Sequence, residues 1–322
     1  MRLDSRPRTR LAGVAALTAS ALLASACGTS TPAATTGAAK PAAAVPAAGF
    51  AAHPGLKRAL RALEASYDGR IGAVAIDTGT GRAVGHRAHE RFPFNSMFKV
   101  YACAAVLRKA RDTDPGLLDR VVRWKPGEVL ENSPETKEYT DTGMTPAQLC
   151  RAAITKSDGL AGNMLLKQIG GPAGLTAYFR TLGDRVSRLD RYEPYLTGWA
   201  PGEQRDTTTP AAAAGSFSQI TVGRALDDRD RDRLTGWLRG SLTGAQRIKA
   251  GLPATWTVGD KTGTGGASNH GTANDTAIVW PPGSTAPIIM SVLTNRNAKG
   301  VPHDDKVIAD TATELAKALG RL

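Results

Sequence analysis

The sequence is poor in the residues on which several large classes of protein depend. Aromatic residues make up only 5% of the 322 residues, and there are just five histidines and three cysteines. The formal net charge is +12, but the basic residues are scattered and no stacking aromatics, finger or helix-turn-helix pattern accompanies them. Charge without such a pattern does not indicate nucleic-acid binding, so we expect no nucleic-acid partner.

Metal-ligand and phosphate-loop patterns are also missing. Only His86 and His89 have a spacing close to that of a ligand pair, and no neighbouring cluster supplies a third and fourth ligand, so zinc chemistry is not expected. The sequence contains no Gly-x-Ser-x-Gly elbow, and Asp260 precedes Lys261 where a phosphate loop requires glycine.

No apolar run is long enough to span a bilayer, but the N-terminus has the layout of an export signal. Four arginines precede the apolar run 11–23, and the small residues Ala24-Ser25-Ala26 follow it. This layout predicts a secretory signal peptide over 1–26. The segment 22–27 looks like a lipobox, which favours lipidation of Cys27 over plain secretion. We expect an exported protein, either anchored by a lipid at the outer face of the cell membrane or secreted.

The remaining chain alternates between two kinds of pattern. Residues 27–50, mostly Ala, Thr, Pro and Gly, predict a flexible linker. Helical spacing at 56–67 is followed by strand alternation at 71–77, and strand patterns return at 256–264, 276–280 and 287–294 before a helix at 305–319. Between them the pattern is mainly helical, with helices at 97–109, 146–155 and 160–169. The predicted fold class is α/β plus all-α: an α/β domain from 51–86 and 240–322, with an all-α domain, 87–239, inserted.

Three motifs carry chemistry. Ser96 and Lys99 lie three residues apart at the start of a predicted helix, so they share a face, and the lysine amine can take the hydroxyl proton of a serine nucleophile. Ser157-Asp158-Gly159 lies in the helical region and Lys261-Thr262-Gly263-Thr264 on a predicted strand. Each motif alone is weak, but their order and spacing together are specific.

From about Leu56 to its C-terminus the sequence resembles the class A serine β-lactamases. The resemblance implies an antiparallel sheet flanked by terminal helices, with the active site between the two domains. It implies that Ser96 attacks the lactam carbonyl, that Lys99 serves as base or proton relay, and that Ser157 passes a proton to the departing nitrogen. It also implies that Lys261, Thr262 and Gly263 bind the substrate carboxylate, with Arg247 as a second anchor for that carboxylate. The backbone N–H groups of Ser96 and Thr264 would stabilise the oxyanion.

The stretch 188–206 resembles the Ω loop of this family. Glu193 matches the carboxylate that deprotonates the hydrolytic water. Arg191 and Asp206 match an ion pair at the neck of the loop, and Asn163 matches a residue that ties the loop from beneath. The resemblance further implies a cis peptide bond between Glu193 and Pro194.

Several positions depart from the family or leave alternatives open. Thr197 stands where an asparagine usually helps to hold the hydrolytic water. Gly159 replaces the asparagine of the second motif, which predicts a roomier pocket. We therefore expect Gly159→Asn to improve the hydrolysis of penicillins with small side chains. Trp124 matches an aromatic at the rim of the site, with a buried structural tryptophan as the alternative. Cys103 and Cys150 match positions that some relatives bridge by a disulfide, against two buried free thiols on the residues alone.

The resemblance therefore predicts a monomeric β-lactam hydrolase that confers antibiotic resistance, with a small-molecule β-lactam as its partner and no metal or organic cofactor. A penicillin-binding D,D-peptidase shares the three motifs but would lack Glu193. A β-lactam sensor would keep its acyl adduct. Persistence of the adduct separates hydrolase from sensor.

Overall fold

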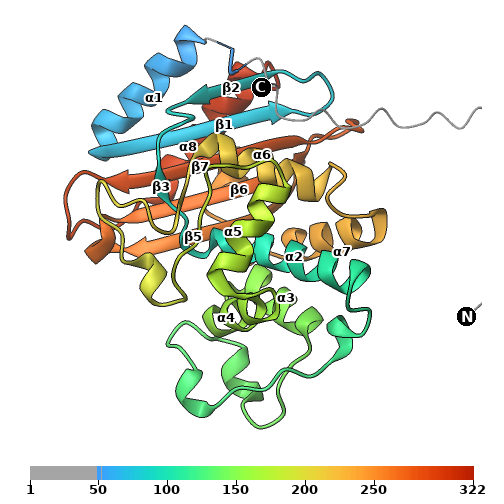
Figure 1. Cartoon of the computed structure of the whole chain (residues 1–322). Coiled ribbons are helices and arrows are strands. Elements are labelled where there is room, and N and C mark those ends of the chain that lie inside the picture. Colours follow the sequence, from blue (N-terminus) through green and yellow to red (C-terminus); the bar gives the residue numbers. More distant parts are fainter. Residues whose placement is uncertain (1–48, 52) are drawn as a thin grey trace, which may run out of the picture. The chain divides into compact units, whose positions relative to one another are not determined.

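A five-stranded antiparallel sheet forms the centre of the computed structural model, which describes residues 49–51 and 53–322 (Figure 1). Its strands lie in the order β2-β1-β7-β6-β5. Their bounds are β1 Gly69–Asp77, β2 Ala83–His86, β5 Thr257–Gly266, β6 Thr272–Trp280 and β7 Ile288–Arg296. The predicted antiparallel sheet is confirmed, and β5, which carries the third motif, is an edge strand.

The terminal helices α1 (Pro54–Tyr67) and α8 (Asp305–Ala318) cover one face of this sheet. The His53 side chain accepts a hydrogen bond from Leu56 N at 3.0 Å and caps α1, and Pro54 fits the first turn because it needs no amide partner there. Leu60 and Ile308 are fully buried between helices and sheet. Burying one such side chain contributes about 1.5–3 kcal/mol, so this apolar layer holds α1 and α8 on the sheet.

The other helices come from the middle of the chain. They are α2 (Phe98–Asp112), α3 (Pro146–Thr155), α4 (Gly159–Gln168), α5 (Gly171–Thr181), α6 (Pro210–Thr221) and α7 (Asp228–Arg239), with short 3-10 turns η1 (Asn95–Met97), η2 (Leu117–Asp119), η3 (Pro126–Glu128), η4 (Thr136–Tyr139), η5 (Tyr195–Thr197), η6 (Ile248–Gly251) and η7 (Ala267–Asn269). Helix α2 contacts all five of the other helices in this group. Its apolar residues are buried nearly all round, as expected of a central helix.

The predicted division at residues 87 and 239 differs from the packing in two ways. Helix α6 packs against β1, β6 and β7, so one hydrophobic cluster joins sheet residues such as Ile289 to helical residues such as Phe217. The segment predicted as all-helical also contains a two-stranded sheet, β3 (Phe92–Pro93) with β4 (Thr207–Thr208). Strands of two residues leave no periodic pattern, which is why the sequence did not reveal them.

The predicted disulfide between Cys103 and Cys150 is absent from the structure, where both are buried free thiols. Cys103 lies on α2 and Cys150 on the adjacent α3. Burial and the neighbouring Cys150 thiol raise the pKa of Cys103 well above its ordinary value. Packing brings the thiols together, whereas a bond between them also requires an oxidant.

The predicted signal peptide, Cys27 and almost all of the linker lie outside the described residues. The linker's last residue, Phe50, already packs against the core, and Ala51 N donates to Ala83 O at 3.0 Å. In the described part of the chain, no helix combines the length and the hydropathy needed to cross a bilayer.

Candidate active site

The nucleophile of the first motif lies in a tight turn at the start of α2. Ser96 belongs to η1 and is 7% exposed, while Lys99 in the first turn of α2 is fully buried. Because residues three apart share a helix face, Lys99 Nζ reaches Ser96 Oγ at 2.8 Å.

Lys99 makes two further contacts. Its Nζ donates to Ser157 O at 2.7 Å and lies 2.8 Å from Glu193 Oε1. An ammonium group has three N–H donors, so Ser96, Ser157 and Glu193 together match all of them. Lys99 therefore joins the first two motifs to the loop that carries Glu193.

Glu193 is 3% exposed and contacts the nucleophile directly. Ser96 Oγ donates to Glu193 Oε1 at 2.7 Å. Burial alone would raise the pKa of Glu193, but the Lys99 charge and hydrogen bonds from Lys99, Asn132 and Ser96 lower it below its ordinary value. The group is thus an ionised carboxylate at neutral pH, able to accept a proton.

The loop 188–206 holds Glu193 through its backbone and its neck. Asn163 Nδ2 donates to Glu193 O at 2.8 Å and Asn163 Oδ1 accepts from Glu193 N at 3.0 Å, and the peptide bond to Pro194 is cis. At the neck, Arg191 Nε lies 2.5 Å from Asp206 Oδ2, with Asp206 only 1% exposed. Asp206 O also accepts from Phe94 N at 2.7 Å, which links the loop's end to the turn that carries Ser96.

The second and third motifs meet where Lys261 contacts Ser157. Lys261 Nζ donates to Ser157 Oγ at 2.9 Å, and Ser157 has a left-handed φ of 57° at the start of α4. Lys261 is fully buried, and desolvation together with the charge of Lys99 lowers its pKa to about 7. Since Lys261 occupies the acceptor side of Ser157 Oγ, the Ser157 O–H is free to donate to a substrate atom.

Strand β5 passes close to the nucleophile turn. A Cβ at Gly263 would lie 3.0 Å from Phe94 O and 3.2 Å from Met97 N, so glycine is what permits this approach. It brings Thr264 beside the turn. Thr262 Oγ1 lies 2.6 Å from Thr243 Oγ1, at the same end of the strand as Lys261.

Arg247 lies beneath β5 and is 3% exposed. It donates to Gly263 O at 3.0 Å, to Asn274 O at 2.8 Å and to Thr264 Oγ1 at 2.7 Å. Its Nε also donates to Asp305 Oδ1 at 2.9 Å, so the guanidinium is ion-paired on one side and holds the Thr264 hydroxyl on the other.

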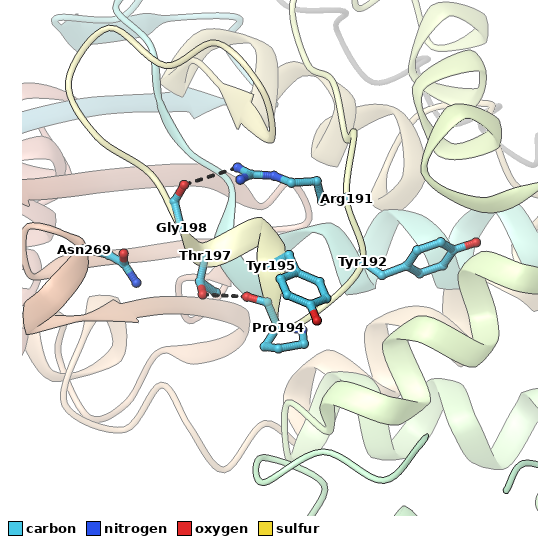
Figure 2. A pocket seen from close by; sticks show the side chains of 7 residues that line it. All are labelled: Arg191, Tyr192, Pro194, Tyr195, Thr197, Gly198 and Asn269. Carbon is cyan, nitrogen blue, oxygen red and sulfur yellow. Dashed lines mark hydrogen bonds between the residues drawn. The ribbon is translucent and has the colours of Figure 1, made fainter. Parts of the chain in front are cut away.

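Two predicted site residues lie elsewhere. Trp124 is 6% exposed and packs in the hydrophobic core. It is therefore a buried structural tryptophan, and its ring offers no surface on which a substrate could stack. Thr197 donates to Pro194 O at 2.9 Å, and Figure 2 shows its hydroxyl turned to that carbonyl in a groove lined also by Tyr195 and Asn269. The threonine side chain is shorter than that of asparagine, and its hydroxyl bonds within its own turn. In the described part of the chain, Thr197 therefore has no contact with Glu193.

Gly159 does not open the pocket as predicted, because a residue that the motifs did not reveal fills the space. Asn132 Nδ2 donates to Glu193 Oε2 at 2.9 Å. A Cβ at Gly159 would lie 2.4 Å from Asn132 Oδ1. Asn132 belongs to none of the three motifs. The only signal in the sequence is that Gly159 lacks a side-chain amide, which another residue can then provide.

A buried serine, lysine and carboxylate in mutual contact, with a second serine and lysine facing them, define a serine hydrolase that works through an acyl-enzyme. Residues 55–319 match the β-lactamase enzyme family. The chain is 48% identical over 258 residues to β-lactamase AST-1 of Nocardia asteroides, covering 80% of this chain and 82% of that one. It is 46% identical to the carbapenem-hydrolyzing β-lactamase KPC of Klebsiella oxytoca, covering 80% and 87%.

Solved structures agree with the sequence comparison. The crystal structure of a β-lactamase from Streptosporangium roseum matches with a TM-score of 0.81 and 60% identity, covering 83% of this chain and 99% of that one. A mutant of the class A β-lactamase of the last common ancestor of Gram-negative bacteria matches with a TM-score of 0.77 and 45% identity, covering 82% and 98%. The chain belongs to the β-lactamase enzyme family, as a class A serine enzyme.

Proposed function

We propose that this protein confers β-lactam resistance by opening the lactam ring in two steps, acylation of Ser96 and hydrolysis of the resulting ester. The observation that carries the proposal is the triangle of Ser96 Oγ, Lys99 Nζ and Glu193 Oε1, with sides of 2.7 to 2.8 Å. It unites a nucleophile, a proton relay and a general base in one buried cluster.

In the first step, Ser96 Oγ bonds to the lactam carbonyl carbon as its proton passes to Glu193, either directly or through Lys99, which gives one of its own protons to Glu193 as it takes that of Ser96. Backbone N–H groups of Ser96 and Thr264 stabilise the oxyanion. When the ring C–N bond breaks, the Ser157 hydroxyl gives its proton to the nitrogen and is reprotonated through Lys99, which in turn takes the proton held by Glu193. Glu193 is therefore ionised again before the second step. The product is an ester on Ser96 with an opened ring.

In the second step, Glu193 takes a proton from a water molecule as its oxygen attacks the ester carbon. The C–O bond to Ser96 breaks and the proton returns to Ser96 Oγ, so the enzyme is regenerated. Both steps use the same carboxylate because the Glu193 oxygen already lies within 2.7 Å of Ser96 Oγ.

The substrate carboxylate binds at β5. Lys261 supplies charge, Thr262 and Thr264 supply hydroxyl groups, and Arg247 adds a positive potential from beneath the strand. Thr264 Oγ1 accepts from Arg247 at 2.7 Å, so its own O–H points away from the arginine and can donate to the carboxylate.

Glu193 favours a hydrolase over the two rivals. A D,D-peptidase or a sensor needs the acylating serine but no buried base beside it for ester hydrolysis. Purified protein should hydrolyse benzylpenicillin, followed by loss of lactam absorbance, and Ser96→Ala should abolish this. A panel that includes a cephalosporin and a carbapenem defines the substrate range. A wild-type protein that only accumulates adduct with every compound would support the sensor.

The export signal, the lipid on Cys27, the bridge between Cys103 and Cys150 and the monomeric state are part of the same proposal. An exported chain meets oxidants that can join two adjacent thiols. Intact mass of the cell-derived protein tests both modifications: a diacylglyceryl mass on Cys27 and no free thiol after unfolding support them. An unmodified Cys27 in the medium, or two free thiols, contradicts the respective part.

A further inference from the structure

Asn132 presents its side-chain amide to the general base from outside the three motifs. Its Nδ2 lies 2.9 Å from Glu193 Oε2, while Glu193 Oε1 is occupied by Ser96 and Lys99. The two carboxylate oxygens therefore have different partners, and the Asn132 contact fixes which oxygen faces the nucleophile.

The segment that carries Asn132 is held in place before any substrate binds. Gly159 N donates to Asn132 O at 2.8 Å. The buried Asp158 carboxylate accepts from Glu135 N at 2.9 Å and from Thr136 N at 2.8 Å, and Thr136 Oγ1 donates to it as well. The second motif thus anchors the Asn132 segment with its aspartate and its glycine.

Gly159 leaves room for this amide. A Cβ built at Gly159 would lie 2.4 Å from Asn132 Oδ1 and 2.6 Å from Glu193 Oε2, both closer than real Cβ atoms approach such atoms. A side chain at position 159 therefore crowds both the Asn132 amide and the Glu193 carboxylate that it contacts. The glycine and the asparagine form a matched pair.

We propose that Asn132 is a positioning residue for Glu193 and that residue 159 must be glycine for Asn132 to reach it. This deepens the proposed hydrolysis and rests on Glu193 being its general base. The amide donates to Glu193 Oε2, so it favours the ionised carboxylate that must accept the proton of water and keeps the other oxygen aimed at the Ser96 ester. The contact acts on the second step more than on substrate binding.

The test is a cycle of four proteins: wild type, Asn132→Ala, Gly159→Asn and the double variant. Asn132→Ala should lower kcat roughly 10-fold or more, the scale of a hydrogen bond to a charged group, with a smaller change in KM. Losing a donor raises the pKa of a carboxylate, so the acidic limb of kcat should move to higher pH. A purely structural role would lower the rate without moving that limb.

Gly159→Asn alone should also lower kcat, because the new side chain displaces Asn132. In the Asn132→Ala background the same change has no Asn132 amide left to displace and crowds only Glu193, so it should lower kcat by a clearly smaller factor than in the wild type. An equal effect of Gly159→Asn in both backgrounds, or an Asn132→Ala protein with wild-type kcat and pH limb, would overturn the proposal. Asn132 is exposed, so Asn132→Ala should fold normally, and thermal unfolding verifies this for each variant.

A pair of substrates separates positioning from direct substrate recognition. Benzylpenicillin carries an acyl side chain, and 6-aminopenicillanic acid lacks it. Asn132→Ala should reduce kcat for both by a similar factor, whereas a loss confined to benzylpenicillin would contradict action through Glu193. Hydrolysis by the wild type and its absence in Ser96→Ala are measured alongside, so failure of this proposal is distinguishable from failure of the proposed function.

Discussion

Ser96 Oγ donates its hydrogen bond to Glu193 Oε1 at 2.7 Å, although Lys99 Nζ is equally near. The reason is the number of donors on Lys99, whose three N–H groups all find acceptors and leave no lone pair for the serine. The carboxylate is therefore the resting acceptor of the nucleophile's proton. Lys99 receives a proton only after it has given one up.

The low pKa of Lys261 predicts a pH dependence of substrate capture. With a pKa of about 7, Lys261 is protonated below neutrality and loses its charge as the pH rises. Because the protonated form attracts the substrate carboxylate, kcat/KM should fall as the pH rises through about 7. In the enzyme–substrate complex the bound carboxylate favours protonated Lys261, so the fall of kcat should occur at higher pH than that of kcat/KM. Stopped-flow hydrolysis across pH 5–9, an interval spanning about two units either side of that pKa, measures both limbs.

The matched control for this prediction is a substrate change. A penicillin methyl ester carries no carboxylate charge, so its slower hydrolysis should lack the basic limb. The same limb for acid and ester would show that another group titrates.

The neck of the Ω loop should contribute measurably to stability. Asp206→Ala removes the buried partner of Arg191 and the acceptor of Asp190 N at 2.7 Å. Breaking a buried ion pair costs ~3–5 kcal/mol, and the partial exposure of Arg191 puts the expected loss near the lower value. Thermal unfolding should show a Tm lower by several degrees, and kcat should fall because Glu193 loosens.

Arg205→Ala is the control on the same loop. Arg205 pairs with Glu203 at the surface, with half of its side chain exposed, so its removal should leave Tm unchanged. Equal shifts for Asp206→Ala and Arg205→Ala would contradict a special role for the neck.

Gly263 should tolerate no side chain. Gly263→Ala adds a Cβ 3.0 Å from Phe94 O, which pushes β5 away from Ser96. Overpacking of this kind costs ~1–3 kcal/mol, and kcat/KM should fall further than stability because the oxyanion site widens. Gly236→Ala in α7 is the control: a Cβ there meets nothing within 4 Å, so it should raise stability by up to ~1 kcal/mol and leave hydrolysis unchanged. Full activity in Gly263→Ala would show that the close approach is not required.

The parts of the site that the sequence predicted are those that local rules dictate. Ser96 and Lys99 share a helical face by spacing alone. The helices predicted at 146–155 and 305–319 follow from helical periodicity, and the structure has them at 146–155 and 305–318. Asn132 could not be predicted in this way. It reaches Glu193 only through the tertiary packing of two loops 61 residues apart in sequence.

Tertiary contacts of this kind also explain where the structure differs from the sequence prediction. The sequence alone predicts a space at Gly159, but the Asn132 side chain fills it, so Gly159→Asn should harm the wild-type enzyme. The sequence leaves Trp124 open between the rim of the site and a buried structural position, and only the packing decides for the buried one. Thr197 satisfies its hydroxyl locally with Pro194 O, a choice that depends on the conformation of the loop.

The most direct test of the account is the fate of the acyl-enzyme in Glu193→Ala. Intact-protein mass spectrometry after mixing with benzylpenicillin should show the protein plus one intact drug mass that persists, because Lys99 can still relay the Ser96 proton while no base activates water. Steady-state hydrolysis should fall ~10²–10⁴-fold, the usual worth of a general base, after a burst near one product per enzyme. Ser96→Ala should show no adduct. Near-wild-type turnover by Glu193→Ala without an adduct would contradict the assignment of Glu193 as the base that completes hydrolysis.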